Sequence, residues 1–298
     1  MKQTMRLLLC LLGATYATEA QAQTDSLLVV SWNVENFLNP RTDTTGRHTF
    51  GRMKAKCNSI SKTILLIADT EGRIPDAIAL MEVGDCYVLE RLLHDTPLRK
   101  LGYGIVHYDS PDRRGIDCAL LYRRSSLKLL RSAPKHLYDS SGAIMPTRDI
   151  LLAEFDGLDI LVNHHPSKVG SGSGGRRAIA MARMRSIMDS LEAAGHRAIL
   201  SAGDFNDDVW QGSGRGTIKY NGAWEKIDGF FSRGSIVVRE TVFDAPCLSE
   251  PDRSFGGTKP RRAFSGPRWN GGVSDHFPVL LIIKKRPEPW FRPSGCSD

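Results

Sequence analysis

Residues 27–37, Leu-Leu-Val-Val-Ser-Trp-Asn-Val-Glu-Asn-Phe, join a short apolar run to a group of polar side chains. The run at 27–31 predicts a buried strand, because short apolar runs bounded by polar residues are typical of one. Asn33 and Glu35 follow directly where that strand is expected to end. Functional side chains gather at strand ends in α/β proteins, since a rigid sheet holds the loops there. This stretch therefore predicts an α/β fold with a site at the end of a sheet.

Four more apolar runs of the chain have polar side chains of the same kinds at one end. A single carboxylate at a strand end is usually a cap or a turn former. Five such places, all carrying acidic, amide or imidazole groups, instead indicate that the strand ends share one site. Glu82, Asn163 with His164 and His165, and Asp204 with Asn206 follow three of these runs. Asp275 with His276 comes just before the run at 278–283.

Helical periodicity is found in two further segments. Apolar residues recur every three or four positions across 53–67 and again across 184–191, which predicts two helices with one buried face each. Gly195 is the predicted stop of the second helix. The runs expected to form strands are 27–31, 77–81, 119–122, 150–155, 158–163, 198–201 and 278–283.

Three glycine-rich segments, 170–175, 211–216 and 249–273, are expected to be loops. No linker rich in Pro or Ser divides the chain. Residues 23–298 are therefore expected to form a single α/β catalytic domain.

The first 22 residues have the pattern of a secretory signal peptide. Lys2 and Arg6 form a basic start, residues 7–12 form a short apolar run, and Ala20-Gln21-Ala22 places small residues at a cleavage position. The run is too short to span a bilayer, so no stable membrane anchor is expected. The mature chain is predicted to be secreted or periplasmic, and monomeric.

Composition narrows the class of partner. Hydrophobic residues make up 41% of the chain, which allows a substantial core and argues against wholesale disorder. The formal net charge is +7, and loss of Lys2, Arg6 and Glu19 with the signal peptide lowers it by one to +6. A basic surface favours anionic partners such as nucleic acid, phosphorylated small molecules or anionic lipid.

Five cysteines follow residue 22, so at least one thiol is free or paired between chains. Cys118 lies in an apolar run and is the predicted buried free thiol. The expected disulfides are Cys57–Cys86 and Cys247–Cys296. No Cys-x-x-Cys pair occurs, which disfavours a structural zinc site built on cysteines.

The predicted site is rich in carboxylates and has no cysteine ligand. Such a set suits Mg²⁺, with Mn²⁺ or Ca²⁺ as alternatives. The sequence has no glycine-rich loop ending in Lys-Ser or Lys-Thr and no Gly-x-Ser-x-Gly segment. Nucleotide-driven motors and serine esterases are therefore disfavoured.

At these residues the chain resembles the endonuclease/exonuclease/phosphatase superfamily, which includes deoxyribonucleases, abasic-site endonucleases, neutral sphingomyelinases and inositol polyphosphate phosphatases. The resemblance runs from about Leu27 to Ile283. It implies a four-layer α/β/β/α sandwich, with two central mixed β-sheets flanked by helices, and metal-dependent hydrolysis of phosphate esters. The segments that carry it are Ser-Trp-Asn-Val-Glu-Asn-Phe (31–37), Ala-Leu-Met-Glu-Val (79–83), Gly-Asp-Phe-Asn-Asp (203–207) and Ser-Asp-His-Phe-Pro-Val (274–279).

The resemblance also implies the metal ligands and the group that activates water. Glu82 resembles the principal metal ligand, and Glu35 and Asp275 resemble further carboxylates on the metal side. Asp204 resembles the residue that positions or deprotonates the attacking water. Such groups are needed because water is a poor nucleophile at neutral pH and because phosphodiester hydrolysis builds negative charge on the phosphate.

The remaining roles that the resemblance implies belong to histidines and to substrate contacts. His276 resembles the imidazole that contacts the scissile phosphate, and Asp228 resembles its orienting partner, since a carboxylate fixes the tautomer of an imidazole and raises its pKa. His164 matches a second histidine of deoxyribonuclease-like members, whereas His165 is expected at the surface. The catalytic set is completed by Asn206, and the predicted substrate contacts are Asn33, Arg148, Asn163, Lys168, Arg261 and Arg262.

Two loops bear on the substrate. Residues 209–224 and 253–269 interleave cationic and aromatic side chains, which suits a phosphate backbone with stacked bases. A solvated basic loop is the alternative. A secreted nuclease is the favoured interpretation. A phosphatase or lipid-headgroup phosphodiesterase on the same scaffold, and a non-catalytic binding protein, are the alternatives that stay open.

Overall fold

The computed structural model describes residues 26–168, 172–209, 215–234 and 236–284. The predicted signal peptide and Cys296 lie outside the described residues. Within those ranges no helix is long and apolar enough to cross a membrane.

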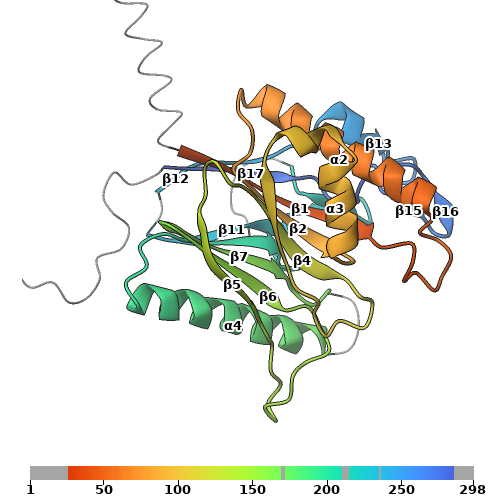
Figure 1. Cartoon of the computed structure of the whole chain (residues 1–298). Helices are drawn as coiled ribbons and strands as arrows, with labels where there is room; N and C mark the ends of the chain where they lie inside the picture. The colour runs from red at the N-terminus through yellow and green to blue at the C-terminus, as the bar shows by residue number, and fades with distance from the viewer. Residues whose placement is uncertain (1–25, 169–171, 210–214, 235, 285–298) are drawn as a thin grey trace, which may run out of the picture.

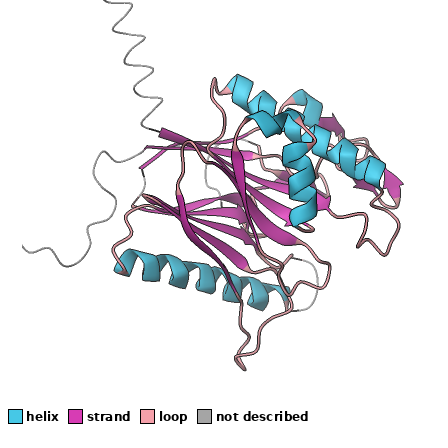
Figure 2. Cartoon of the chain, in the orientation of Figure 1, coloured by secondary structure: helices cyan, strands magenta, loops and turns pink. Residues whose placement is uncertain are grey.

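Two β-sheets face each other, and helices cover their outer faces (Figures 1 and 2). One sheet has the strand order β12–β17–β1–β2–β4–β3 and the other has the order β11–β8–β7–β6–β5. Both are mixed, because β1 runs parallel to β2, β7 runs parallel to β8, and the other neighbours are antiparallel. The predicted four-layer α/β/β/α sandwich is confirmed.

The element bounds are as follows. The six-stranded sheet contains β1 (Ser26–Phe37), β2 (Ala77–Val83), β3 (Tyr103–His107), β4 (Asp117–Arg123), β12 (Ile236–Val242) and β17 (Val279–Lys284). The five-stranded sheet contains β5 (Leu129–Lys135), β6 (Ile150–Phe155), β7 (Leu158–His164), β8 (Ile199–Asp204) and β11 (Asp228–Arg233). The helices are α2 (Phe50–Thr70), α3 (Cys86–His94) and α4 (Ser173–Ala193). Three hairpins are β9 (Ile218–Tyr220) with β10 (Ala223–Glu225), β13 (Ser249–Pro251) with β14 (Thr258–Pro260), and β15 (Phe264–Ser265) with β16 (Arg268–Trp269).

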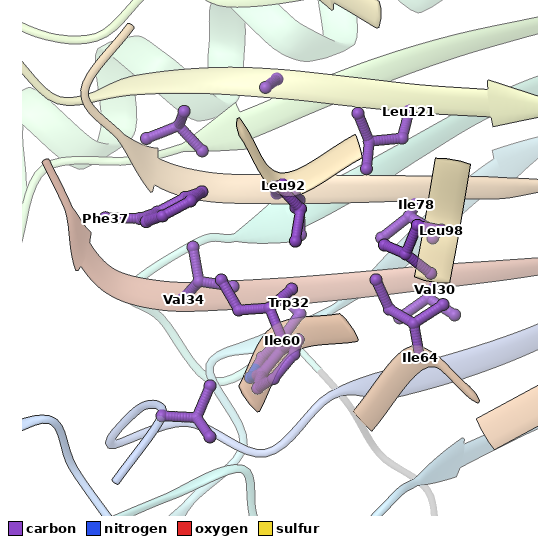
Figure 3. Close-up of a cluster of buried hydrophobic side chains, with 14 of the residues drawn as sticks. Val30, Trp32, Val34, Phe37, Ile60, Ile64, Ile78, Leu92, Leu98 and Leu121 are labelled. Atoms are coloured by element: carbon purple, nitrogen blue, oxygen red, sulfur yellow. The ribbon is translucent and has the colours of Figure 1, made fainter. Parts of the chain in front are cut away.

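Alternate residues of β1 enter different cores, as the two-residue period of a strand requires. Val30 and Trp32 pack outward against α2 and α3, where they meet Ile60 and Ile64 (Figure 3). Val29 instead packs between the two sheets. A third core joins α4 to the five-stranded sheet. Three separate cores thus hold the four layers together.

Both predicted helices are present, but the segment 170–175 is not wholly a loop. Helix α4 begins at Ser173, and Gly172 before it adopts a left-handed φ of 69° that a side chain would disfavour. The predicted loop 249–273 contains the β13–β14 and β15–β16 hairpins. The expected Cys57–Cys86 disulfide is wrong, because both thiols are free, and Cys118 is free and buried as predicted. The Cys247–Cys296 pairing falls partly outside the described residues.

Candidate active site

Side chains alternate between the two faces of a strand, and this alternation places several polar side chains at one end of the space between the sheets. In β8, Leu200 and Ala202 face that space, and Asp204 follows on the same face. In β7, Val162 faces it, and His164 comes two residues later. In β1, Asn33 lies four residues after Val29 and on the same face of the strand, which is turned toward the space between the sheets.

Glu35 and Glu82 depend instead on irregular backbone. The β1–β2 register shifts between Asn33 and Phe37, and the β2–β4 register shifts between Met81 and Val83. Glu35 and Glu82 have left-handed φ values of 49° and 63°. Such values are uncommon outside glycine and gather at functional sites, where bulges redirect side chains.

These residues surround a cavity of about 270 Å³. Most of the predicted catalytic and metal-binding side chains line it, together with groups that the sequence did not single out. The polar lining residues are Asn33, Glu35, Asn36, Glu82, Arg114, His164, Ser167, Asp204, Asn206, Arg262, Asp275 and His276.

His276 and Asp228 form a buried pair at the back of this cavity. The His276 Nδ1 lies 2.8 Å from Asp228 Oδ2, and the Thr217 hydroxyl donates a short hydrogen bond to the same oxygen. Burial alone would lower the pKa of His276, but the charge of Asp228 outweighs it and raises that pKa well above the ordinary value. The Asp228 carboxylate therefore favours the protonated form of His276, whose ring lines the cavity.

Asp204 lies between the two sheets with both carboxylate oxygens engaged. Its Oδ2 accepts a hydrogen bond from Asn33 Nδ2 at 3.0 Å, and its Oδ1 accepts one from the Asn206 backbone amide at 2.9 Å. Burial, followed by the charge of Asp228, raises the pKa of Asp204 to about 7. A carboxylate with a pKa near 7 can take a proton from water at physiological pH.

His164 faces the same carboxylate as a neutral ring. Its Nε2 lies 3.7 Å from Asp204 Oδ2 and 3.9 Å from Glu82 Oε1. Burial, and then the positive charge of Arg148, lowers the pKa of His164 well below the ordinary value. The ring is therefore suited to donating or accepting a hydrogen bond rather than to carrying charge.

Three carboxylates occupy the other side of the cavity. Arg262 bridges two of them, with Nε 3.3 Å from Glu35 Oε1 and Nη2 2.8 Å from Asp275 Oδ2. The third, Glu82, accepts the Asn36 backbone amide at 2.8 Å. Burial, followed by the charge of Asp275, raises the pKa of Glu35 to about 7.

These carboxylates fit a divalent cation. They offer the hard oxygen donors that such cations prefer. Glu35 and Asp275 also repel each other, and a bound cation would neutralise that repulsion. Asp204, Asp228 and His276 also carry ligand-type atoms within 4.8 Å of one another. Because His276 and Asp228 are already hydrogen-bonded as a pair, Glu82 with Glu35 and Asp275 is the set that could hold a cation.

Comparison with known proteins places this geometry in a family. A model described as the Endonuclease/Exonuclease/phosphatase family matches residues 31–233 and 210–285. The chain belongs to the endonuclease/exonuclease/phosphatase family. It is therefore a hydrolase that acts on phosphoester bonds, in a family that typically uses a divalent metal. The comparison with curated proteins returned no match.

Solved structures support the fold of this family member. D. rerio TDP2 complexed with a single-strand DNA product is 16% identical, with a TM-score of 0.54 over 87% of this chain and 99% of that one. The human Nocturnin catalytic domain is 15% identical, with a TM-score of 0.55 over 87% and 94%. A mannosyl-6-phosphatase from Bacteroides thetaiotaomicron is 17% identical, with a TM-score of 0.55 over 86% and 99%. Identities this low establish the fold alone.

Several predicted substrate contacts of this phosphoesterase lie outside the cavity. Asn163 is on the opposite face of β7, fully buried, where its Nδ2 donates to Ser201 Oγ at 2.8 Å. Lys168 pairs with Glu225 at 2.5 Å. The guanidinium of Arg261 is exposed and donates to the Asn270 carbonyl oxygen at 3.2 Å. Their absence from the cavity lining follows from strand parity and from loop contacts that a sequence pattern does not reveal.

Arg148 is held next to the cavity rather than in it. It donates to Asp112 Oδ2 at 3.1 Å and to the His165 carbonyl oxygen at 2.7 Å. It lines an adjoining cavity of about 250 Å³, which shares Arg114 and Ser167 with the catalytic one. His165 was expected at the surface, but it is 1% exposed and its ring packs on Phe205 at 5.1 Å.

Three residues of the site were missed from the sequence. Lys56 is buried in α2 and donates to the Glu35 carbonyl oxygen, Thr217 supports Asp228, and Arg114 lines the cavity. A lysine within the apolar stripe of a predicted helix was a usable signal for Lys56. Thr217 and Arg114 come from loops, and nothing in their local sequence marks them.

The two loops proposed for substrate binding are only partly free. In the first, Trp224 stacks on Phe277 at 5.8 Å, and Lys219 lies 2.9 Å from Asp252, while Trp210 falls outside the described residues. Among the described residues of both loops, the exposed large aromatic side chains are Tyr220 in the first and Phe255 in the second. In the second loop, Arg262 reaches the catalytic carboxylates.

Proposed function

We propose that this family member is a divalent-metal-dependent phosphodiesterase that cleaves nucleic acid, with Mg²⁺ as the cation. The observation that carries the proposal is the single cavity that combines three carboxylates with the His276–Asp228 pair and with Asp204. Carboxylates for a cation, an acid and a base are the parts that phosphodiester hydrolysis requires.

Each group has a distinct role in the proposed reaction. A cation held by Glu82, Glu35 and Asp275 would stabilise the negative charge that develops on the phosphate. Asp204, oriented by Asn33 and Asn206, takes the proton of the attacking water. The water oxygen bonds to phosphorus as the bond to the leaving oxygen breaks. The His276 imidazolium hydrogen-bonds to the phosphate and gives its proton to the leaving oxygen.

A larger groove beside the cavity supports a polymeric substrate. It has a volume of about 1020 Å³ and shares Glu35, Asn36, Arg114 and Arg262 with the catalytic cavity. Arg47 and Arg113 also line it and are exposed. A substrate that projects beyond its scissile phosphate would extend along this groove.

Carboxylates line the groove as well, and several are already engaged. Asp43 accepts the backbone amides of Thr45 and His48, Asp85 caps α3, and Glu35 pairs with Arg262. Within the described residues Arg47 and Arg113 form no ion pair with these carboxylates, so they are the groove arginines that an anionic substrate could pair with. The D. rerio TDP2 structure with a DNA product makes nucleic acid the first substrate to test.

A phosphatase of small phosphate esters is the second candidate. The catalytic cavity alone, at about 270 Å³, is enough for a phosphate and one attached sugar. The Bacteroides thetaiotaomicron relative named a mannosyl-6-phosphatase shows that the same fold occurs in such an enzyme.

Parallel assays distinguish these functions. Residues 23–298 with Mg²⁺ would be offered plasmid DNA, single-stranded DNA, RNA, mannose 6-phosphate, inositol phosphates and sphingomyelin, with Asp204→Asn as the inactive control. Cleavage of DNA or RNA is the expected result. Turnover of a small ester or of lipid alone would replace the nuclease proposal, and inactivity on every substrate would favour a binding protein.

We also propose that residues 1–22 are removed and that the mature chain is a secreted or periplasmic monomer. The basic start, apolar run and small residues of the N-terminal sequence support this. N-terminal sequencing of protein from culture medium and from periplasmic extract should begin at Gln23. Recovery of the full-length chain from the cytoplasm alone would contradict it.

A further inference from the structure

Three potential metal ligands meet at the base of the β3–β4 connection. His107 ends β3, Asp117 begins β4, and Asp109 lies in the loop between them. One ligand atom from each lies within 4.8 Å of the other two. None of the three lines the catalytic cavity, but Asp109 and Asp117 line the groove that leads to it.

The His107 ring is buried without the hydrogen bond that burial normally demands. Its side chain is 4% exposed, and within the described residues Nε2 has no hydrogen-bond partner. Asp117 Oδ2 lies 3.5 Å from that nitrogen, too far for a good hydrogen bond. An unsatisfied buried ring nitrogen is costly, so a further ligand at this point would stabilise the site.

The 3.5 Å separation suits two ligands of one metal ion. Zinc–nitrogen and zinc–oxygen bonds of about 2.0–2.2 Å at tetrahedral angles put neighbouring ligand atoms roughly 3.4 Å apart. A hydrogen-bonded ion pair would instead bring them to about 2.8 Å. The observed distance is therefore closer to a shared cation than to a direct pair.

The sheet fixes two of the ligands in place. His107 pairs with Ala119 across β3 and β4, and Asp117 pairs with Val83 across β4 and β2. Asp117 Oδ1 accepts the Ser110 backbone amide at 2.9 Å, which leaves Oδ2 directed at His107. Asp109 is exposed and can rotate to complete the set.

We propose that His107, Asp109 and Asp117 bind a transition-metal cation of the Zn²⁺ or Mn²⁺ class at a site separate from the catalytic centre. One imidazole nitrogen and two carboxylates suit such ions, whereas Mg²⁺ and Ca²⁺ favour all-oxygen sets. The cation faces the groove and places positive charge on the wall where an anionic substrate would pass.

The test is the number of Zn²⁺ ions that each variant binds, measured by equilibrium dialysis and metal analysis. His107→Gln and Asp109→Asn should each bind one ion fewer than the wild type, with at least a tenfold loss of affinity at this site. Glu82→Gln should lose only the catalytic ion, and Glu82→Gln with His107→Gln should lose both. His136→Gln is the matched control, because His136 pairs with Asp149 at 2.9 Å outside this cluster.

Asp109→Asn keeps the test decisive even if the buried His107→Gln variant misfolds, since Asp109 is exposed. In the Glu82→Gln background, Zn²⁺ should raise the melting temperature, and Asp109→Asn should abolish that rise. Hydrolysis with Mg²⁺ should be unchanged in His107→Gln, so a failed nuclease proposal would not affect the outcome. If both variants bind as many Zn²⁺ ions as the wild type, no metal site exists and His107 and Asp117 form only an ion pair.

Discussion

Asp228 and His276 reach each other from different sheets, because Asp228 begins β11 of one sheet and His276 precedes β17 of the other. The charge state of His276 therefore depends on how the two sheets are packed. The Trp32 indole nitrogen donates to the His276 carbonyl oxygen at 3.0 Å and anchors that segment to β1. His276, the acid of the proposed reaction, therefore owes its charge to a contact between the two sheets and not to its neighbours in the sequence.

We expect Asp228 and His276 to act as a unit in catalysis. His276→Ala should lower kcat by roughly 10³-fold, within the range found for general acid–base groups. Asp228→Asn should lower kcat by about 10²-fold, because the imidazole loses its positive charge and its orientation. The double variant should be about as slow as His276→Ala alone, measured as kcat on the best substrate. A double-variant defect equal to the product of the two single defects would show independent roles.

Glu82 is expected to dominate metal binding. Glu82→Gln keeps the size of the side chain but removes its charge, so it should lower turnover about 10³-fold or more through loss of several kcal/mol of charge stabilisation. Glu90→Gln, on the exposed face of α3, is the matched control and should be fully active. EDTA should abolish wild-type activity, and excess Mg²⁺ should restore it. Full turnover in EDTA would contradict metal dependence.

At the level of elements, the sequence predicted the interior strands of the two large sheets but not their edge strands. Strands β1, β2, β7 and β8 are buried on both faces and appear as apolar runs. In the two large sheets, the strands not predicted are β3, β5, β11 and β12, and all four lie at sheet edges. An edge strand has one hydrogen-bonded neighbour and carries polar side chains that discourage further pairing, so its pattern is weak. The strand-end residues of the site were predictable for the same reason that the interior strands were.

Edge strand β12 carries a partly buried carboxylate that should make stability depend on pH. Burial raises the pKa of Glu240 to about 7 from an ordinary value of 4.5. Between those two pH values the native chain holds a proton that the unfolded chain has released. The free energy of unfolding should therefore fall as pH rises through that window.

Glu240→Gln removes this dependence because its amide does not ionise. Relative to the wild type, the variant should gain about 1–2 kcal/mol in free energy of unfolding between pH 4.5 and pH 8, after allowance for solvent screening. Urea unfolding at several pH values measures the difference. Glu90→Gln, with an exposed carboxylate, should show no such trend. A constant offset between Glu240→Gln and the wild type at all pH values would show that Glu240 ionises normally.

At the level of the whole molecule, the active site occupies one end of the sandwich, and the groove continues from it past the loops at 42–48 and 109–115. Helix α4 covers the outer face of the five-stranded sheet (Figure 1). The net charge of the chain predicted an anionic partner but could not say where that partner binds. Under the proposed function, the placement of Arg47 and Arg113 on the groove wall makes this groove the expected place of binding.

Replacing the two exposed arginines of the groove tests whether it binds a phosphate backbone. Arg47→Ala with Arg113→Ala removes two exposed cations that do not touch the catalytic carboxylates, in contrast to Arg262. KM for nucleic acid should rise, and the dependence of log affinity on log salt concentration should become shallower by about one for each phosphate that the variant no longer neutralises. Cleavage of bis-p-nitrophenyl phosphate should be unchanged, because that ester has no flanking phosphates to bind. Arg185→Ala with Arg197→Ala, two exposed arginines in and after α4, is the control for net charge. If this control flattens the salt dependence as much as the groove variant does, the effect comes from overall charge and the groove is not the binding track.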